Sequence, residues 1–78
     1  MTVTNKLNNR YYMTYDYNTD TVTLNGYEVV EWRCDNDQYV QVRTSHGIFK
    51  LEMLDAYYDI DYPNWCELYA YAWDVITG

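Results

Sequence analysis

An Asn-Gly pair between two β-rich runs is the feature of this sequence that most constrains its fold. Asn25 and Gly26 separate residues 21–24 from residues 27–33, and both runs are rich in β-branched and aromatic side chains. A type I′ turn needs positive φ at both central residues, and Asn-Gly tolerates this better than other pairs. The pair therefore predicts a two-residue hairpin in which Leu24 faces Tyr27 and Val22 faces Val29.

Alternating patterns on both sides of this hairpin predict further strands. Apolar and polar side chains alternate over residues 11–17, 39–44 and 48–53, and short polar turns separate these runs. Such spacing is typical of an antiparallel meander. Residues 1–9 are polar and rich in Asn, so we expect a loose N-terminal arm with at most an edge strand at residues 2–4.

The period of the pattern changes in the last third of the chain. Asn64 followed by Glu67 resembles a capping box, and Pro63 is a common residue just before a helix. Apolar residues then recur at the spacing of one helix face. They are Trp65, Leu68, Tyr69, Ala72 and Ile76. We predict an α+β fold: a small antiparallel β-sheet meander of four or five strands with one C-terminal α-helix, residues 64–76, packed on it.

Length and composition fit a single folded domain over residues 1–78. Of the 78 residues, 49% are hydrophobic, far more than a disordered chain carries. We expect a core that includes Trp32, Val40, Val42, Leu51, Leu68 and Ala72.

The net charge of −7 argues against direct binding to nucleic acid or to an anionic membrane. No apolar run is long enough to cross a bilayer, and no secretory signal is recognisable, so we expect a cytoplasmic protein.

The two cysteines, Cys34 and Cys66, fit the same compartment. A secreted domain of this size usually carries four to eight cysteines, so the count favours free thiols in a reducing environment, with a single disulfide as the alternative.

Charge is distributed unevenly along the chain. Residues 1–50 carry six acids and all five bases, a net −1, whereas residues 51–78 carry six acids and no base, a net −6. One interpretation is a solvated face that keeps the protein soluble. The other is an anionic docking face, because tyrosine and tryptophan, which accompany these acids, are enriched in protein interfaces. The docking interpretation predicts a contact segment made of Glu52, Asp55, Tyr57, Tyr58, Asp59, Asp61 and Tyr62.

The spacing of these carboxylates resembles that of phosphates in a nucleic acid strand. Asp59 and Asp61 would lie about 6.6 Å apart on an extended segment, and Asp55 and Asp59 about 6 Å apart on a helical turn.

The tyrosines of the predicted strand at residues 11–17 also have two interpretations. Tyr11, Tyr15 and Tyr17 either form half-buried cross-strand pairs or offer a stacking platform for bases, although no basic rim accompanies them.

No sequence motif points to catalysis, a cofactor or a metal. His46, the only histidine, lies in a predicted turn without an orienting partner. Asp35 and Asp37, like Asp59 and Asp61, could offer oxygen ligands, but neither pair has the spacing of a calcium loop. We therefore expect a protein that is not an enzyme and has no cofactor.

In size, acidity and abundance of Tyr, Asp and Asn, which supply 26 of its 78 residues, the chain resembles the small acidic proteins of bacteriophages and mobile elements that disable host factors. Anti-CRISPR proteins, anti-restriction proteins and other DNA mimics are of this type. The resemblance implies an inhibitor that docks its acidic face on a basic, nucleic-acid-binding surface of a host protein in the host cytoplasm. The alternative is a structural or assembly protein, homo-oligomeric through its exposed aromatic strands, whose acidic residues serve solubility.

Overall fold

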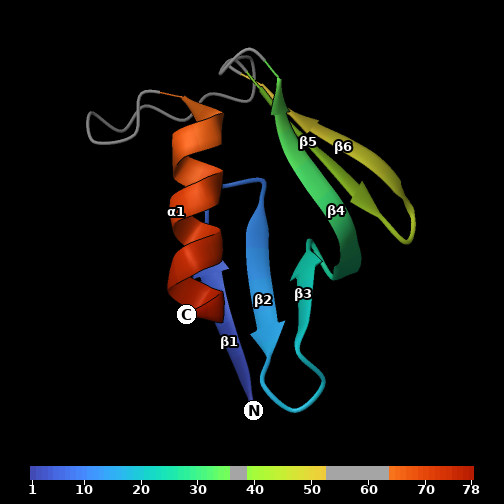
Figure 1. Cartoon of the computed structure of the whole chain (residues 1–78), viewed down its shortest axis with the longest axis vertical. Coiled ribbons are helices and arrows are strands. Elements are labelled where there is room, and N and C mark those ends of the chain that lie inside the picture. The colour runs from blue at the N-terminus through green and yellow to red at the C-terminus, as the bar shows by residue number, and fades with distance from the viewer. Residues whose placement is uncertain (36–38, 53–63) are drawn as a thin grey trace.

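The computed structural model describes residues 1–35, 39–52 and 64–78, and these residues form six strands and one helix. The elements are β1 (Thr2–Lys6), β2 (Tyr12–Asp16), β3 (Thr21–Leu24), β4 (Tyr27–Asp35), β5 (Tyr39–Thr44), β6 (Gly47–Leu51) and α1 (Trp65–Thr77). All neighbouring strands are antiparallel and follow one another in sequence order across the sheet, as Figure 1 shows. The predicted α+β meander is confirmed, with six strands instead of four or five.

The additional strand is β1, which lies within the segment expected to be a loose arm. All five of its residues pair with β2, from Thr2 opposite Asp16 to Lys6 opposite Tyr12. Leu7, which follows the strand, is only 2% exposed. The edge strand expected at residues 2–4 is therefore present and extends to Lys6, and the expectation that the rest of this segment is a loose arm is corrected. Backbone hydrogen bonds to an otherwise open sheet edge can order a strand whose side chains are mostly polar.

The predicted hairpin is present at β3 and β4. Asn25 has a φ of 52° and Gly26 a φ of 86°, as a type I′ turn requires. Leu24 lies opposite Tyr27 as expected. The backbone N–H of Tyr12 donates to Asn25 Oδ1 at 3.0 Å, so the turn is also tied to β2.

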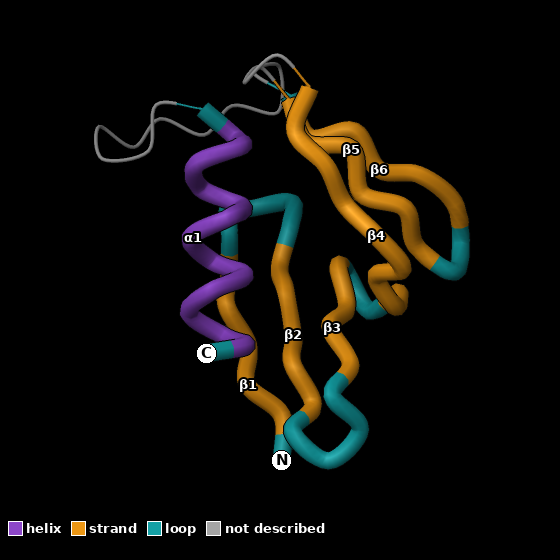
Figure 2. The backbone as a smooth tube through the Cα atoms, viewed as in Figure 1, coloured by secondary structure: helices purple, strands orange, loops and turns teal. Residues whose placement is uncertain are grey.

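The hairpin is shorter than the sequence predicts, because β4 contains a bulge. Pairing between β3 and β4 ends at Thr23 opposite Glu28, so the expected pair of Val22 with Val29 does not form. On the other side of β4, Val29 lies opposite Thr44 and Glu31 lies opposite Arg43, which leaves Val30 as the extra residue. Beyond the bulge β4 pairs with β5 alone, and Figure 2 shows it bending away from β3.

The core lies between the two halves of the bent sheet and α1. Helix α1 contacts β1, β2 and β5. The side chains least exposed to solvent are Met13, Leu24, Val40, Val42, Leu51 and Tyr69, each 0% exposed. Five of the six predicted core residues are buried, and Trp32 is half-buried against Tyr69, with ring centroids 4.8 Å apart.

Helix α1 forms where the sequence predicts it. Asn64 is its N-cap in extended conformation, and its side chain accepts a hydrogen bond from the backbone N–H of Glu67 at 3.0 Å. The buried face contains the whole predicted stripe, together with Cys66. This face closes the core, and it leaves Glu67, Tyr71, Asp74 and Val75 exposed.

Candidate functional site

Of the seven residues predicted to form the docking segment, the structure describes one. Glu52 follows β6 and is half-buried. Its backbone carbonyl accepts a hydrogen bond from Trp65 Nε1 at 2.8 Å, so it lies beside the start of α1. The other six predicted residues lie outside the described residues. They are Asp55, Tyr57, Tyr58, Asp59, Asp61 and Tyr62.

The outward face of β4, β5 and β6 is a surface of paired charges, which we call the ion-pair face. Its three pairs are Arg33 with Asp35 at 3.6 Å, Arg43 with Glu31 at 3.2 Å and Lys50 with Glu52 at 3.9 Å. Each of its cations therefore has an acid of the same face beside it. Exposed ion pairs of this kind add little stability. Their consequence here is electrostatic, since the three positive and three negative charges of these described pairs sum to zero.

A shallow hollow lies on the ion-pair face. Its volume is about 450 Å³, and its charged lining consists of Glu31, Arg33 and Arg43. Arg33 Nε also donates to Gln41 Oε1 at 3.2 Å. The guanidinium groups in this hollow are thus already occupied by neighbours on the sheet.

The net negative charge of the protein consequently comes from residues outside these three pairs. Setting aside the three acids and three bases of the ion-pair face leaves nine acids and two bases, Lys6 and Arg10, which account for the full net charge of −7. Five of the nine acids are described, and none of them forms an ion pair with another described residue. They are Asp16, Asp20, Glu28, Glu67 and Asp74.

Two of these acids lie beside a second hollow, which we call the acidic groove. The groove has a volume of about 400 Å³ and lies where β4 separates from β3, with the C-terminal part of α1 as its other wall. Its lining residues are Tyr15, Asp20, Thr21, Val22, Glu28, Val29, Val30, Trp73 and Thr77. Asp20 and Glu28 are both exposed, and the lining contains no basic residue.

The carboxylate of Asp20 is held in place at this groove. Tyr15 donates its hydroxyl hydrogen to Asp20 Oδ1. This hydrogen bond to a carboxylate, more than the accompanying loss of hydration, raises the pKa of Tyr15 above its ordinary value. Asp20 adopts a φ of 56°, a conformation in which Asp and Asn are the common non-glycine residues. The backbone and the hydrogen bond together fix where this negative charge lies.

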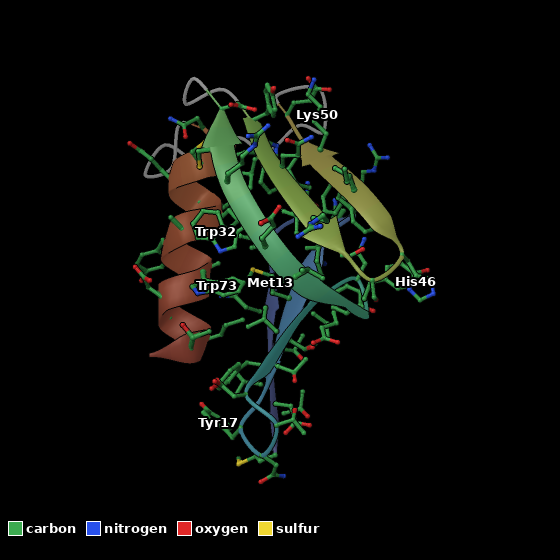
Figure 3. The ribbon with its side chains drawn as sticks, turned by 45° about the vertical axis from the view of Figure 1, so that its right-hand side comes forward. Met13, Tyr17, Trp32, His46, Lys50 and Trp73 are labelled. Atoms are coloured by element: carbon green, nitrogen blue, oxygen red, sulfur yellow. The ribbon has the colours of Figure 1, made fainter. Side chains whose placement is uncertain are left out.

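Trp73 supplies the aromatic wall of the acidic groove. Figure 3 shows Trp73 extending from α1 and Trp32 from β4 into the space between these elements, and their ring centroids are 5.7 Å apart. Trp73 also lies 6.2 Å from the ring of Tyr69, which is fully buried. Trp73 is half-buried and lines the groove, and its indole lies beside these two rings.

Two of the three tyrosines, Tyr11 and Tyr15, serve packing, but not as the half-buried cross-strand pairs that one interpretation predicts. Tyr15 is 9% exposed, and Tyr11 packs edge-on against Trp65 with centroids 5.8 Å apart. Only Tyr17 of the three is largely exposed, and it stands edge-on to Tyr15 at 5.0 Å. These rings therefore do not form the flat, accessible platform that base stacking requires.

The remaining reactive side chains do not assemble into a catalytic arrangement among the described residues. His46 lies in the turn between β5 and β6, stacks on Tyr27 with centroids 4.4 Å apart, and has Ser45 Oγ 3.3 Å from its Nδ1. No carboxylate of the described part of the chain orients this imidazole. Cys34 is exposed and Cys66 is buried, and both are free thiols. In residues 1–35, 39–52 and 64–78, no group of three His, Cys, Asp or Glu could hold a metal ion.

No helix in the described residues has the length and apolar character needed to cross a membrane. Comparisons with protein-family models, with curated proteins and with solved structures find no match for this chain. The fold alone therefore classifies this protein, as a small α+β domain in which one C-terminal helix packs on an antiparallel meander.

The acidic groove contains residues that sequence patterns do not single out. Asp20, Glu28 and Trp73 are far apart in sequence, and each belongs to a different local element. One signal was available: Val29 and Val30 are adjacent apolar residues that interrupt the strand alternation, and this doublet coincides with the bulge that opens the groove.

Proposed function

We propose that this protein is a stoichiometric inhibitor, encoded by a bacteriophage or mobile element, that docks an acidic surface on a basic, nucleic-acid-binding surface of a host protein. It is not an enzyme in this proposal and uses no cofactor. Its carboxylates take the positions of phosphates opposite lysine and arginine of the host protein, in the manner of anti-CRISPR and anti-restriction DNA mimics.

The observation that carries this proposal is the separation of charge. The three cations of the ion-pair face are neutralised locally, so the net charge of −7 belongs to the remaining residues of the chain. A net negative field of this kind steers association with a basic partner. The contact segment at residues 52–62 remains a prediction from sequence. Its Glu52 is paired with Lys50, whereas Asp55, Asp59 and Asp61 are among the nine acids that give the remaining net charge.

The experiment that tests this role is competition with DNA. The protein is immobilised, a bacterial lysate is passed over it, and retained proteins are eluted with increasing salt and identified. Each retained DNA-binding protein is then purified and mixed with fluorescently labelled duplex DNA, and the protein is titrated into the mixture while the anisotropy of the DNA is followed. We expect complete displacement of the DNA at a 1:1 ratio of protein to host factor.

Two outcomes contradict the proposal. Retention that does not weaken as salt increases would show that charge does not carry the interaction. Host factors that bind the protein and DNA simultaneously would exclude a shared binding surface. Sedimentation velocity of the protein alone serves as the control for the assembly alternative, which predicts a concentration-dependent oligomer and no displacement of DNA.

A further inference from the structure

We propose that the acidic groove between β3, β4 and the end of α1 binds the guanidinium group of an arginine side chain on a partner protein. The inference rests on the proposed docking function and assigns one specific contact to it. This contact lies outside the segment that the sequence predicts. The groove combines three features, namely an aromatic wall, a negative rim and an apolar floor.

The shape of the groove follows from the bulge in β4. Because pairing between β3 and β4 ends at Thr23 opposite Glu28, the two strands separate just where Val29 and Val30 lie. The side chains of Val22 and Val29 form apolar lining, and Val30 is 58% exposed at the edge. An arginine stem of three methylene groups can lie along such a surface while its charged end reaches the rim.

The rim is negative for two independent reasons. Asp20 and Glu28 both line the groove, and no base lines it. In addition, the groove includes Thr77, the last residue of α1, and the last turn of this helix contains no basic residue. The C-terminal end of a helix carries a partial negative charge, which a cation stabilises. Both the carboxylates and the helix end therefore favour a positively charged occupant.

The aromatic wall favours arginine over other cations. Trp73 is half-buried and its ring borders the groove. A guanidinium group is planar, stacks on aromatic rings, and can donate two parallel hydrogen bonds to one carboxylate. Asp20, held by Tyr15, offers a carboxylate whose position is set before binding. Such pre-organisation reduces the ordering that binding would otherwise require.

The test is an NMR titration of the full chain with N-acetyl-arginine methylamide as the probe. We expect saturable shifts of the Trp73 indole N–H and of the backbone amides of Glu28 and Thr77. Titration with N-acetyl-citrulline methylamide, which has the same shape and no charge, should give no saturable shift. Because the probe is a single amino acid, the measurement does not depend on whether a host protein is inhibited.

The matched variants locate the binding site. The double variant Asp20→Asn and Glu28→Gln should weaken binding by at least about fivefold, because it removes both negative charges of the groove lining. Asparagine tolerates the left-handed backbone and can still accept the Tyr15 hydrogen bond, so the fold is retained. The control variant Asp35→Asn and Glu67→Gln changes the net charge equally at residues that do not line the groove, and should bind the probe as the wild type does.

Two results would overturn the assignment. The first is equal saturable binding of the arginine and citrulline probes, and the second is equal weakening in the groove variant and the control. Thermal melting of each variant verifies that it is folded. If the wild-type protein displaces DNA from a host factor but does not bind the arginine probe, the groove assignment alone is contradicted. If it binds the probe but displaces no DNA, only the inhibitory function is contradicted.

Discussion

Tyr15 and Tyr69 show how one residue type has different energetic consequences in this small core. The hydroxyl of Tyr15 donates to Asp20, whereas the hydroxyl of Tyr69 is buried and has no hydrogen-bond partner among the described residues. A buried polar group without a partner loses its hydration and gains nothing in return. We therefore predict that Tyr69→Phe raises the free energy of unfolding by up to about 1 kcal/mol. Tyr15→Phe should lower it, and urea denaturation of both variants measures the contrast.

Burial of Tyr69 also predicts how stability changes at alkaline pH. Loss of hydration raises the pKa of Tyr69 well above its ordinary value of 10.0. The unfolded chain therefore releases this proton at lower pH than the folded chain does. Stability should be constant with respect to this group below about pH 10 and decrease above it. Denaturation between pH 9 and pH 11 should show a smaller decrease for Tyr69→Phe, and equal slopes would contradict this account.

The two cysteines should differ in accessibility to a thiol reagent. Cys34 is exposed, whereas Cys66 is 6% exposed and its Sγ donates to the backbone carbonyl of Tyr39 at 3.4 Å. We expect one thiol per chain to react rapidly with a disulfide reagent in the native protein and the second only after unfolding. Cys34→Ser should abolish the rapid phase. Two rapidly reacting thiols would contradict the burial of Cys66 in α1. No rapidly reacting thiol would contradict the exposure of Cys34 in β4.

At the scale of single elements, the start of α1 depends on one side chain. Asn64 satisfies the backbone N–H of Glu67, which has no partner within the helix. Asn64→Ala should lower the free energy of unfolding by about 1 kcal/mol. Asn64→Asp retains the acceptor and is the matched control, with stability close to that of the wild type. Equal losses in both variants, measured by urea denaturation, would show that the cap is not the cause.

The elements also show what local sequence patterns can and cannot predict. The hairpin at Asn25 and Gly26 and the α1 stripe were predictable, because turn chemistry and helical periodicity are local signals. Strand β1 was predicted only in part, as an edge strand at residues 2–4, because Val3 is the one apolar residue of Thr2–Lys6 and gives little alternation. It is ordered by backbone pairing with β2, which side-chain patterns do not report. The bulge at Val30 was not predicted either, because it depends on how the backbone of β4 pairs with β5. As a result, the hairpin between β3 and β4 has fewer paired residues than predicted.

At the scale of the whole molecule, neither the acidic groove nor the ion-pair face could be predicted. Asp20, Glu28 and Trp73 come together only because β4 bends away from β3 and α1 returns across the sheet. Likewise, sequence totals place five bases among residues 1–50 but do not reveal that three of them are neutralised by Glu31, Asp35 and Glu52. Both features depend on sheet register, which is set by contacts between distant residues.

The central claim, that uncompensated acid steers the protein to a basic partner, is tested most directly by association kinetics. The partner is a host factor whose DNA the protein displaces, and the association rate is measured from low to high salt. The variant Asp55→Asn, Asp59→Asn and Asp61→Asn neutralises the predicted contact segment. The control variant Asp16→Asn, Glu31→Gln and Asp35→Asn changes the net charge by the same amount elsewhere.

At low salt, we expect the contact-segment variant to associate at least about tenfold more slowly than the wild type, with a flatter dependence on salt. The control should retain most of the wild-type rate and most of its salt dependence, because its three acids lie outside the predicted contact segment and leave Asp55, Asp59 and Asp61 in place. Unchanged rates in the contact-segment variant, or equal losses in both variants, would contradict the account.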